Sequence, residues 1–169
     1  MEILEEIRNR STARSFTGEP IAPDALERIL ESGRLAPSAK NRQPWRFVAV
    51  TDKTYRQKIA KACYGDSRIT EAGCVIAACT TNIHYTMPNG QLSYPMDIAF
   101  AVSFMTLQAE HEGLSSAILG TYDESAIKDL LSVPYAMRIV LLLAVGKTGE
   151  EKKLPERFPS SRIISYDHW

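Results

Sequence analysis

The stretch from residue 97 to residue 112 constrains the fold most, because it is apolar around most of a helical circumference. One face has the i, i+3, i+4, i+7 spacing of a helix and is formed by Ile98, Ala101, Val102 and Met105. Further apolar side chains fall on its other faces: Phe100, Phe104 and Leu107. A helix that is apolar on most sides is buried on most sides. In a chain of 169 residues, this predicts a helix at a subunit interface.

Around this helix, the sequence predicts short helices mixed with separated strands. Apolar periodicity predicts helices over residues 1–9, 24–35, 53–63 and 123–131. Compact apolar runs predict strands over residues 47–50, 74–79, 116–119 and 139–145. Residues 36–44 and 82–95 are predicted loops, and the last 23 residues form a polar tail that is disordered or packs outside its own core. The pattern indicates one α+β domain over residues 1–169.

Composition excludes several classes of function. Twenty Lys and Arg balance twenty Asp and Glu, so no global field favours nucleic acid or an anionic membrane. The longest apolar run, residues 139–145, is too short to span a bilayer. The acidic N-terminus lacks the charge pattern of a signal peptide, which favours a cytoplasmic protein. Three cysteines without a CxxC motif, and histidines without ligand spacing, argue against disulfides and a metal site.

Two segments carry residue types suited to binding an anion or a flat ring. Residues 10–14 place Arg10 and Arg14 beside two hydroxyl side chains, and guanidinium groups match phosphate oxygens well. The alternative is a solvated basic turn. Residues 36–45 combine small residues, amides and two prolines before Trp45, so a rigid loop there can lie against a ring. The alternative is a structural loop held by Trp45.

Other motifs do not support a nucleotide-binding loop. Gly146-Lys147-Thr148 follows a predicted strand, but Leu141 stands where a phosphate-binding loop requires glycine. No GxGxxG motif follows any strand, so a dinucleotide-binding fold is unsupported. Tyr85, Tyr94 and Tyr122 are read as packing residues or as the rim of a pocket.

Five segments in the same order resemble the nitroreductase family of flavin enzymes. They are Arg10–Phe16, Ala36–Phe47, Asp97–Ser116, Ile118–Asp123 with Leu130–Pro134, and Val145–Lys147 with Arg157 in the tail. The resemblance implies a central mixed or antiparallel sheet flanked by helices, with a C-terminal tail exchanged between subunits. It further implies a homodimer with two FMN sites at the interface.

The resemblance also implies a set of cofactor-binding residues. Arg10, Ser11, Thr12, Arg14 and Arg157 correspond to the residues that hold the phosphate and ribityl chain. Pro37, Ser38, Ala39 and Asn41 correspond to residues contributed by the other subunit. Ile118, Leu119 and Gly120 correspond to the segment under the isoalloxazine ring. The family usually adds a flavin contact from residues 64–71, which the motifs do not assign to one side chain. The family often has a lysine in the tail where this chain has Pro155, and either Lys152 or Lys153 is a candidate to replace it.

The implied function is that of an FMN-dependent oxidoreductase. Hydride passes from NADH or NADPH through flavin N5 to an electron-poor acceptor, such as a nitroaromatic, a quinone or an enone, by a ping-pong mechanism without a catalytic side chain. One alternative is a specialised reductase or dehalogenase for a single metabolite. Another is a protein that stores FMN or senses redox state with little turnover.

Overall fold

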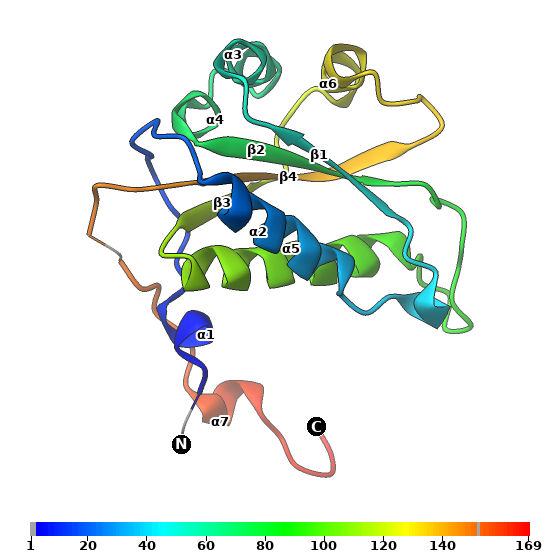
Figure 1. Cartoon of the computed structure of the whole chain (residues 1–169). Coiled ribbons are helices and arrows are strands. Elements are labelled where there is room, and N and C mark those ends of the chain that lie inside the picture. The colour runs from blue at the N-terminus through cyan, green and yellow to red at the C-terminus, as the bar shows by residue number, and fades with distance from the viewer. Residues whose placement is uncertain (1–2, 152) are drawn as a thin grey trace.

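The computed structural model describes residues 3–151 and 153–169, and its centre is a four-stranded antiparallel sheet (Figure 1). The strands are β1 (Trp45–Val50), β2 (Cys74–Thr80), β3 (Ser115–Leu119) and β4 (Arg138–Gly146). They lie in the order β1-β2-β4-β3, and each neighbouring pair is antiparallel. The family resemblance implied either a mixed or an antiparallel sheet, and the sheet formed by these four strands is antiparallel throughout.

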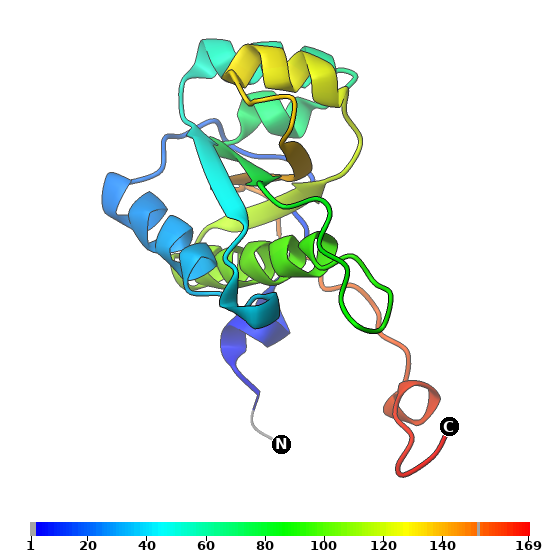
Figure 2. The same ribbon diagram turned by 90° about the vertical axis from the view of Figure 1, so that its right-hand side faces the viewer.

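Helices cover both faces of the sheet and form a three-layer arrangement (Figures 1 and 2). One face carries α2 (Pro23–Arg34) and α5 (Tyr94–His111). The other carries α3 (Lys53–Ala62), α4 (Ser67–Glu71) and α6 (Glu124–Leu131). The short helices α1 (Glu5–Asn9) and α7 (Ser160–Ile163) lie away from the sheet, and η1 (Ala39–Asn41) is a single turn after α2.

The central strand β2 explains why this part of the sequence is a continuous apolar run. All seven of its residues are buried. Because side chains alternate along a strand, Val75, Ala77 and Cys79 pack toward α3, α4 and α6. Cys74, Ile76 and Ala78 pack toward α2 and α5. All three cysteines are buried core residues, and this burial raises the pKa of each thiol, that of Cys74 to about 12.

Helix α5 confirms the prediction of a long apolar helix and shows which of its faces this chain leaves open. Ile98, Val102 and Met105 are fully buried against the sheet and α2. Phe100 and Phe104 remain 47% and 41% exposed. Nearby on α1, Leu4 and Ile7 are also exposed, and Leu4, Ile7 and Phe104 line one shallow groove. The apolar side chains of α5 and of the α1 region that face away from the sheet therefore stay exposed in a single chain.

Most predicted elements are confirmed to within a few residues, with α5 beginning three residues earlier than expected. The short helices α4 and α7 were not predicted. The tail agrees with the expectation that it does not join its own core, because every described residue from 153 to 169 is exposed. Within the described ranges, no helix is both long enough and apolar enough to cross a membrane.

Candidate functional site

The segment that carries Arg10 to Phe16 runs beside β3 as a short parallel extension of the sheet edge. Thr12 forms a parallel bridge with Ser116, and the backbone N–H of Ala13 donates to the carbonyl of Ser116 at 2.9 Å. Ala13 and Phe16 are buried and anchor the segment. Extended backbone alternates its side chains, so Thr12 and Arg14 point out from this anchor.

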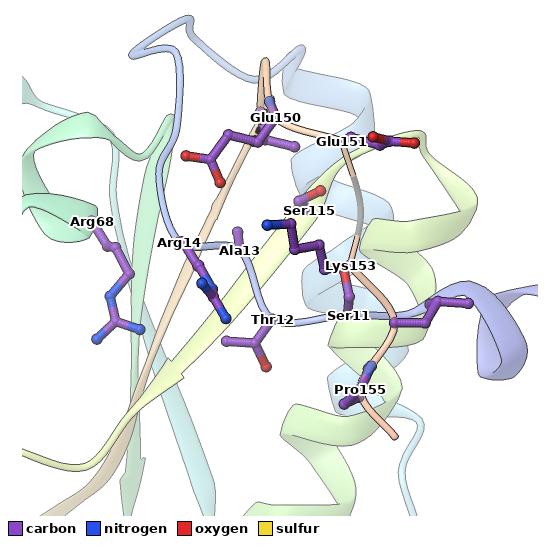
Figure 3. Close-up of a pocket in the computed structure, with 12 residues that line it drawn as sticks. Ser11, Thr12, Ala13, Arg14, Arg68, Ser115, Glu150, Glu151, Lys153 and Pro155 are labelled. Atoms are coloured by element: carbon purple, nitrogen blue, oxygen red, sulfur yellow. Dashed lines mark hydrogen bonds between the residues drawn. The ribbon is translucent and has the colours of Figure 1, made fainter. Parts of the chain in front are cut away.

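A cavity of about 760 Å³ opens at this edge, within the size range of small-molecule sites. Its wall comes from the Arg10–Phe16 segment, β3, α4 and the start of the tail. The lining residues are Ser11, Thr12, Ala13, Arg14, Arg68, Ser115, Thr148, Glu150, Glu151, Lys153, Leu154 and Pro155. Figure 3 shows the guanidinium groups of Arg14 and Arg68 and the hydroxyl of Thr12 on one side of the segment, with the carboxylates of Glu150 and Glu151 above.

Arg68 lies in the range 64–71, from which the family resemblance implies a contact that the sequence motifs did not assign to one side chain. It lies on α4, which is capped by Asp66 through a bond from the Arg68 N–H to the carboxylate at 3.0 Å. The Arg68 Nε and Nη2 atoms donate to the same carboxylate at 2.9 and 2.6 Å. These hydrogen bonds raise the pKa of Arg68 and orient its guanidinium, leaving Nη1 for another acceptor. The Asp66-Ser67 start of a helix is the sequence signal that could have located this contact.

Arg14 differs from Arg68 because it forms no hydrogen bond or ion pair with any residue of the described ranges. Of the two carboxylates in the lining, that of Glu150 already accepts a hydrogen bond from Ser15 Oγ, at 2.6 Å to its Oε1 atom. Lys153 adds a third cation to the lining. Lys152, the other candidate for the tail lysine in the sequence analysis, lies outside the described residues. The donor set of Arg14, Arg68 and Thr12 fits a phosphate group.

The second predicted segment, residues 37–41, lies at the opposite end of α2 from this cavity (Figure 1). Asp97, which is 2% exposed at the start of α5, accepts a bond from the Ala39 N–H at 2.8 Å. Ser38 Oγ accepts from the Gln43 N–H at 2.9 Å. One chain therefore does not bring Pro37, Ser38, Ala39 and Asn41 together with the Arg14 cavity.

The third predicted segment follows β3 away from the cavity. Ile118 is 45% exposed, whereas Leu119 points into the core. Gly120 is exposed, and a Cβ built there would meet nothing within 4 Å, so its backbone is open on that side. Of the remaining predicted residues, Arg10 is half-buried at the end of α1, and Arg157 is exposed in the tail beyond the cavity lining.

Other candidate chemistry has a structural explanation. The Tyr122 hydroxyl donates to the Ile139 carbonyl at 2.8 Å, and burial raises the pKa of this tyrosine. Tyr122 is therefore a core residue. Among the residues that the structure describes, no group of three or more His, Cys, Asp or Glu side chains could hold a metal ion.

The comparison with known proteins decides the family. The family model described as "Nitroreductase family" matches residues 7–92 and 64–147, which covers most of the chain. The chain belongs to the nitroreductase family. The resemblance to this family that the sequence predicts is thus confirmed.

Relatives and solved structures agree with this assignment. A putative NADH dehydrogenase/NAD(P)H nitroreductase from Archaeoglobus fulgidus is 28% identical over 169 residues, covering 96% of each chain. An FMN reductase [NAD(P)H] from Bacillus subtilis is 24% identical over 179 residues, covering 96% of this chain and 72% of that protein. The crystal structure of a nitroreductase family protein from Clostridium difficile 630 superposes with a TM-score of 0.86 at 26% identity, covering all of both chains. The nitroreductase fold therefore spans the full chain.

Proposed function

We propose that the chain is an FMN-dependent oxidoreductase that takes hydride from NADH or NADPH and reduces electron-poor acceptors. The observation that carries this proposal is the cavity in which Arg14, Arg68 and Thr12 face one space beside β3. Two guanidinium groups and a hydroxyl form a donor set for a phosphate ester. The name of the Bacillus subtilis relative, FMN reductase [NAD(P)H], supports FMN as the ester.

In this proposal, FMN held at this site would supply hydride-transfer chemistry between the nicotinamide and a nitroaromatic, a quinone or an enone. Arg14 and Thr12 bind the phosphate end, and Ser11, Arg10 and Arg157 complete the predicted phosphate and ribityl contacts. The open backbone at Gly120, with Ile118 and Leu119 before it, borders the ring. Donor and acceptor use the same pocket in turn, which gives ping-pong kinetics.

A second copy of the chain is part of the proposed site. The segment of residues 37–41 follows the end of α2 that lies far from the Arg14 cavity (Figure 1), so in this proposal it contributes to a flavin held by the partner chain. The exposed apolar surface formed by Leu4, Ile7, Phe100 and Phe104 supports this dimer. The exposed tail packs on the partner in the same assembly.

The deciding experiment is an absorption spectrum of the purified protein before and after addition of excess FMN and desalting. We expect a retained flavin band, together with steady oxidation of NADPH when a quinone is added. Retention of flavin without turnover would favour storage or redox sensing. Absence of the band after soaking would contradict the redox function and leave the fold assignment unchanged.

A further inference from the structure

Lys40 and Arg42 form a small cationic surface over the ring of Tyr85. The Arg42 guanidinium carbon lies 3.9 Å from the centroid of this ring, and the Lys40 ammonium nitrogen lies 5.6 Å from it. Both distances are within the range of a cation–π interaction. An arginine stacked in this way keeps its edge N–H groups directed outward, where they can bind phosphate oxygens.

Neither Lys40 nor Arg42 pairs with a carboxylate of residues 3–151 or 153–169. The loops of residues 36–44 and 81–93 contain no Asp or Glu, while they contain Lys40, Arg42 and His84, and Arg46 follows in β1. Asp97 follows the second loop, but it is buried and its Oδ1 atom accepts from Ala39. None of the ion pairs between described residues involves Lys40 or Arg42. This part of the surface is therefore locally positive on a chain whose net charge is zero.

The structure also holds the two cations in place. Lys40 and Asn41 each have a φ of 53°, in the left-handed region that non-glycine residues adopt rarely. The bond from Ala39 to Asp97 fixes the loop at this turn. Two hydrogen bonds fix the backbone of Tyr85. Its N–H donates to Asn82 Oδ1, and its carbonyl accepts from the Ser93 N–H, both at 3.1 Å. Strained backbone that is fixed by its surroundings is typical of functional sites.

From this arrangement we infer that Lys40 and Arg42 bind the phosphate groups of the reduced nicotinamide dinucleotide. The inference rests on the proposed function, in which the loop carrying Ser38 and Asn41 borders the flavin. A nicotinamide stacked on that flavin must extend its pyrophosphate and adenosine over the rim of the pocket. Lys40 and Arg42, on the same loop as Ser38 and Asn41, supply the charge and the hydrogen-bond donors that this arm requires.

The test uses the full-length protein loaded with FMN and the variants Arg42→Ala and Lys40→Ala. We expect each variant to raise the KM for NADPH about ten-fold, the factor that loss of one charge-assisted phosphate contact gives. We also expect the Kd of NADP⁺, measured by calorimetry without turnover, to rise by a similar factor and to depend less on salt. Tyr85→Ala is expected to have a smaller effect in the same direction, and Tyr85→Phe to restore binding because the ring remains.

Arg46→Ala is the matched control. It removes one positive charge from the same stretch, but its Nη1 atom donates to the Trp45 carbonyl and its guanidinium is not stacked on Tyr85. Unchanged KM and Kd in Arg42→Ala and Lys40→Ala would overturn the inference, as would an equal rise in Arg46→Ala. A loss of FMN affinity with unchanged NADP⁺ binding would assign the cations to the flavin phosphate and also overturn it. A wild-type protein that retains no flavin would instead contradict the proposed function.

Discussion

The Asp97 carboxylate binds the Ala39 backbone N–H at 2.8 Å, joining two residues that lie 58 positions apart. Asp97 is 2% exposed, and its Oδ2 atom has no hydrogen-bond partner among the described residues. Burying a carboxylate without full compensation is costly, and the hydrogen bond to Ala39 is what this carboxylate supplies in return. This bond fixes the loop of residues 38–43, which carries both the predicted flavin contacts and the cations over Tyr85.

Replacing Asp97 should therefore affect both stability and FMN binding. We expect Asp97→Ala to lower the free energy of unfolding by about 1–3 kcal/mol, the usual effect of removing one partner of a buried hydrogen bond. We also expect weaker FMN retention, because this substitution releases the loop that is proposed to contact the partner's flavin. Asp97→Asn keeps an oxygen that can accept from Ala39 and should restore part of both properties.

Val102→Ala is a suitable control for this prediction, because Val102 is fully buried on the same helix and does not contact the loop through a hydrogen bond. Both variants should be less stable in thermal denaturation. Only Asp97→Ala should change the Kd of FMN. An equal loss of FMN affinity in the two variants would show that Asp97 acts through general stability alone.

Arg14 should contribute directly to flavin affinity. We expect Arg14→Ala to raise the Kd of FMN roughly ten- to a hundredfold, since a hydrogen bond to a charged group is worth about 1.5–3 kcal/mol. Fluorescence titration of the apoprotein with FMN measures this directly. Arg34→Ala removes the same charge from an exposed pair with Glu31 and should leave the Kd unchanged. Equal affinity of wild type and Arg14→Ala would remove Arg14 from the site.

The sequence predicted those parts of the fold that depend on neighbours in the chain. The strands around residues 74–79 and 139–145 are continuous apolar runs because they occupy the middle of a sheet covered on both faces. The helix bounded by Tyr94 and His111 is recognisable because it is long and apolar on most of its sides. The antiparallel order of the strands required the structure, because nothing local in the sequence distinguishes one pairing from another.

The site was predicted in part for the same reason. The motifs located the Arg10–Phe16 segment, and the structure places Ser11, Thr12 and Arg14 in one cavity. Arg68 enters that cavity only because α4 packs near β4, a tertiary relationship that the five-residue helix does not reveal. The contact between Arg42 and Tyr85 likewise joins two loops that are 43 positions apart in the sequence.

The exposed apolar surface of α5 should control assembly. If the proposed dimer forms, we expect Phe104→Glu to convert it to a monomer in sedimentation velocity and to weaken FMN retention, because the proposed site needs both chains. The ring is 41% exposed in a single chain, so the substitution should leave the fold of the monomer intact. Tyr135→Ser changes an aromatic residue that is 68% exposed after α6, and it should remain dimeric. A Phe104→Glu protein that is still dimeric would place the interface elsewhere.

Gly146 is expected to be intolerant of any side chain. A Cβ built at this position would lie 2.8 Å from the Gly73 backbone nitrogen and 3.1 Å from Phe16 Cδ1. Because the first of these atoms is backbone, β4 would have to shift, and we expect Gly146→Ala to cost about 1–3 kcal/mol of stability. Chemical denaturation measures the change. Gly120→Ala, where a Cβ meets nothing within 4 Å, should be much closer to wild type in the same experiment.

The ion pair between Arg28 and Glu112 should make stability depend on pH in the acid range. Arg28 Nε and Nη2 each donate to a Glu112 oxygen at 2.7 Å, and Gln108 donates to the same carboxylate at 2.8 Å. The Arg28 bonds, followed by that from Gln108, lower the pKa of Glu112 from its ordinary 4.5 to about 2. A lowered pKa means that the pair stabilises the fold above about pH 4.5 and that this contribution disappears as the pH falls toward 2.

The variant Glu112→Gln tests this dependence, because it removes the charge and keeps the size of the side chain. We expect its melting temperature to lie below that of the wild type at pH 6, and the difference to shrink steadily between pH 4.5 and pH 2. Adding salt at pH 6 should reduce the difference only in part, since the two guanidinium bonds are short and fixed in geometry. A difference that stays constant from pH 6 to pH 2.5 would show that the carboxylate pKa is not lowered by Arg28 and that the link between α2 and the end of α5 does not depend on charge.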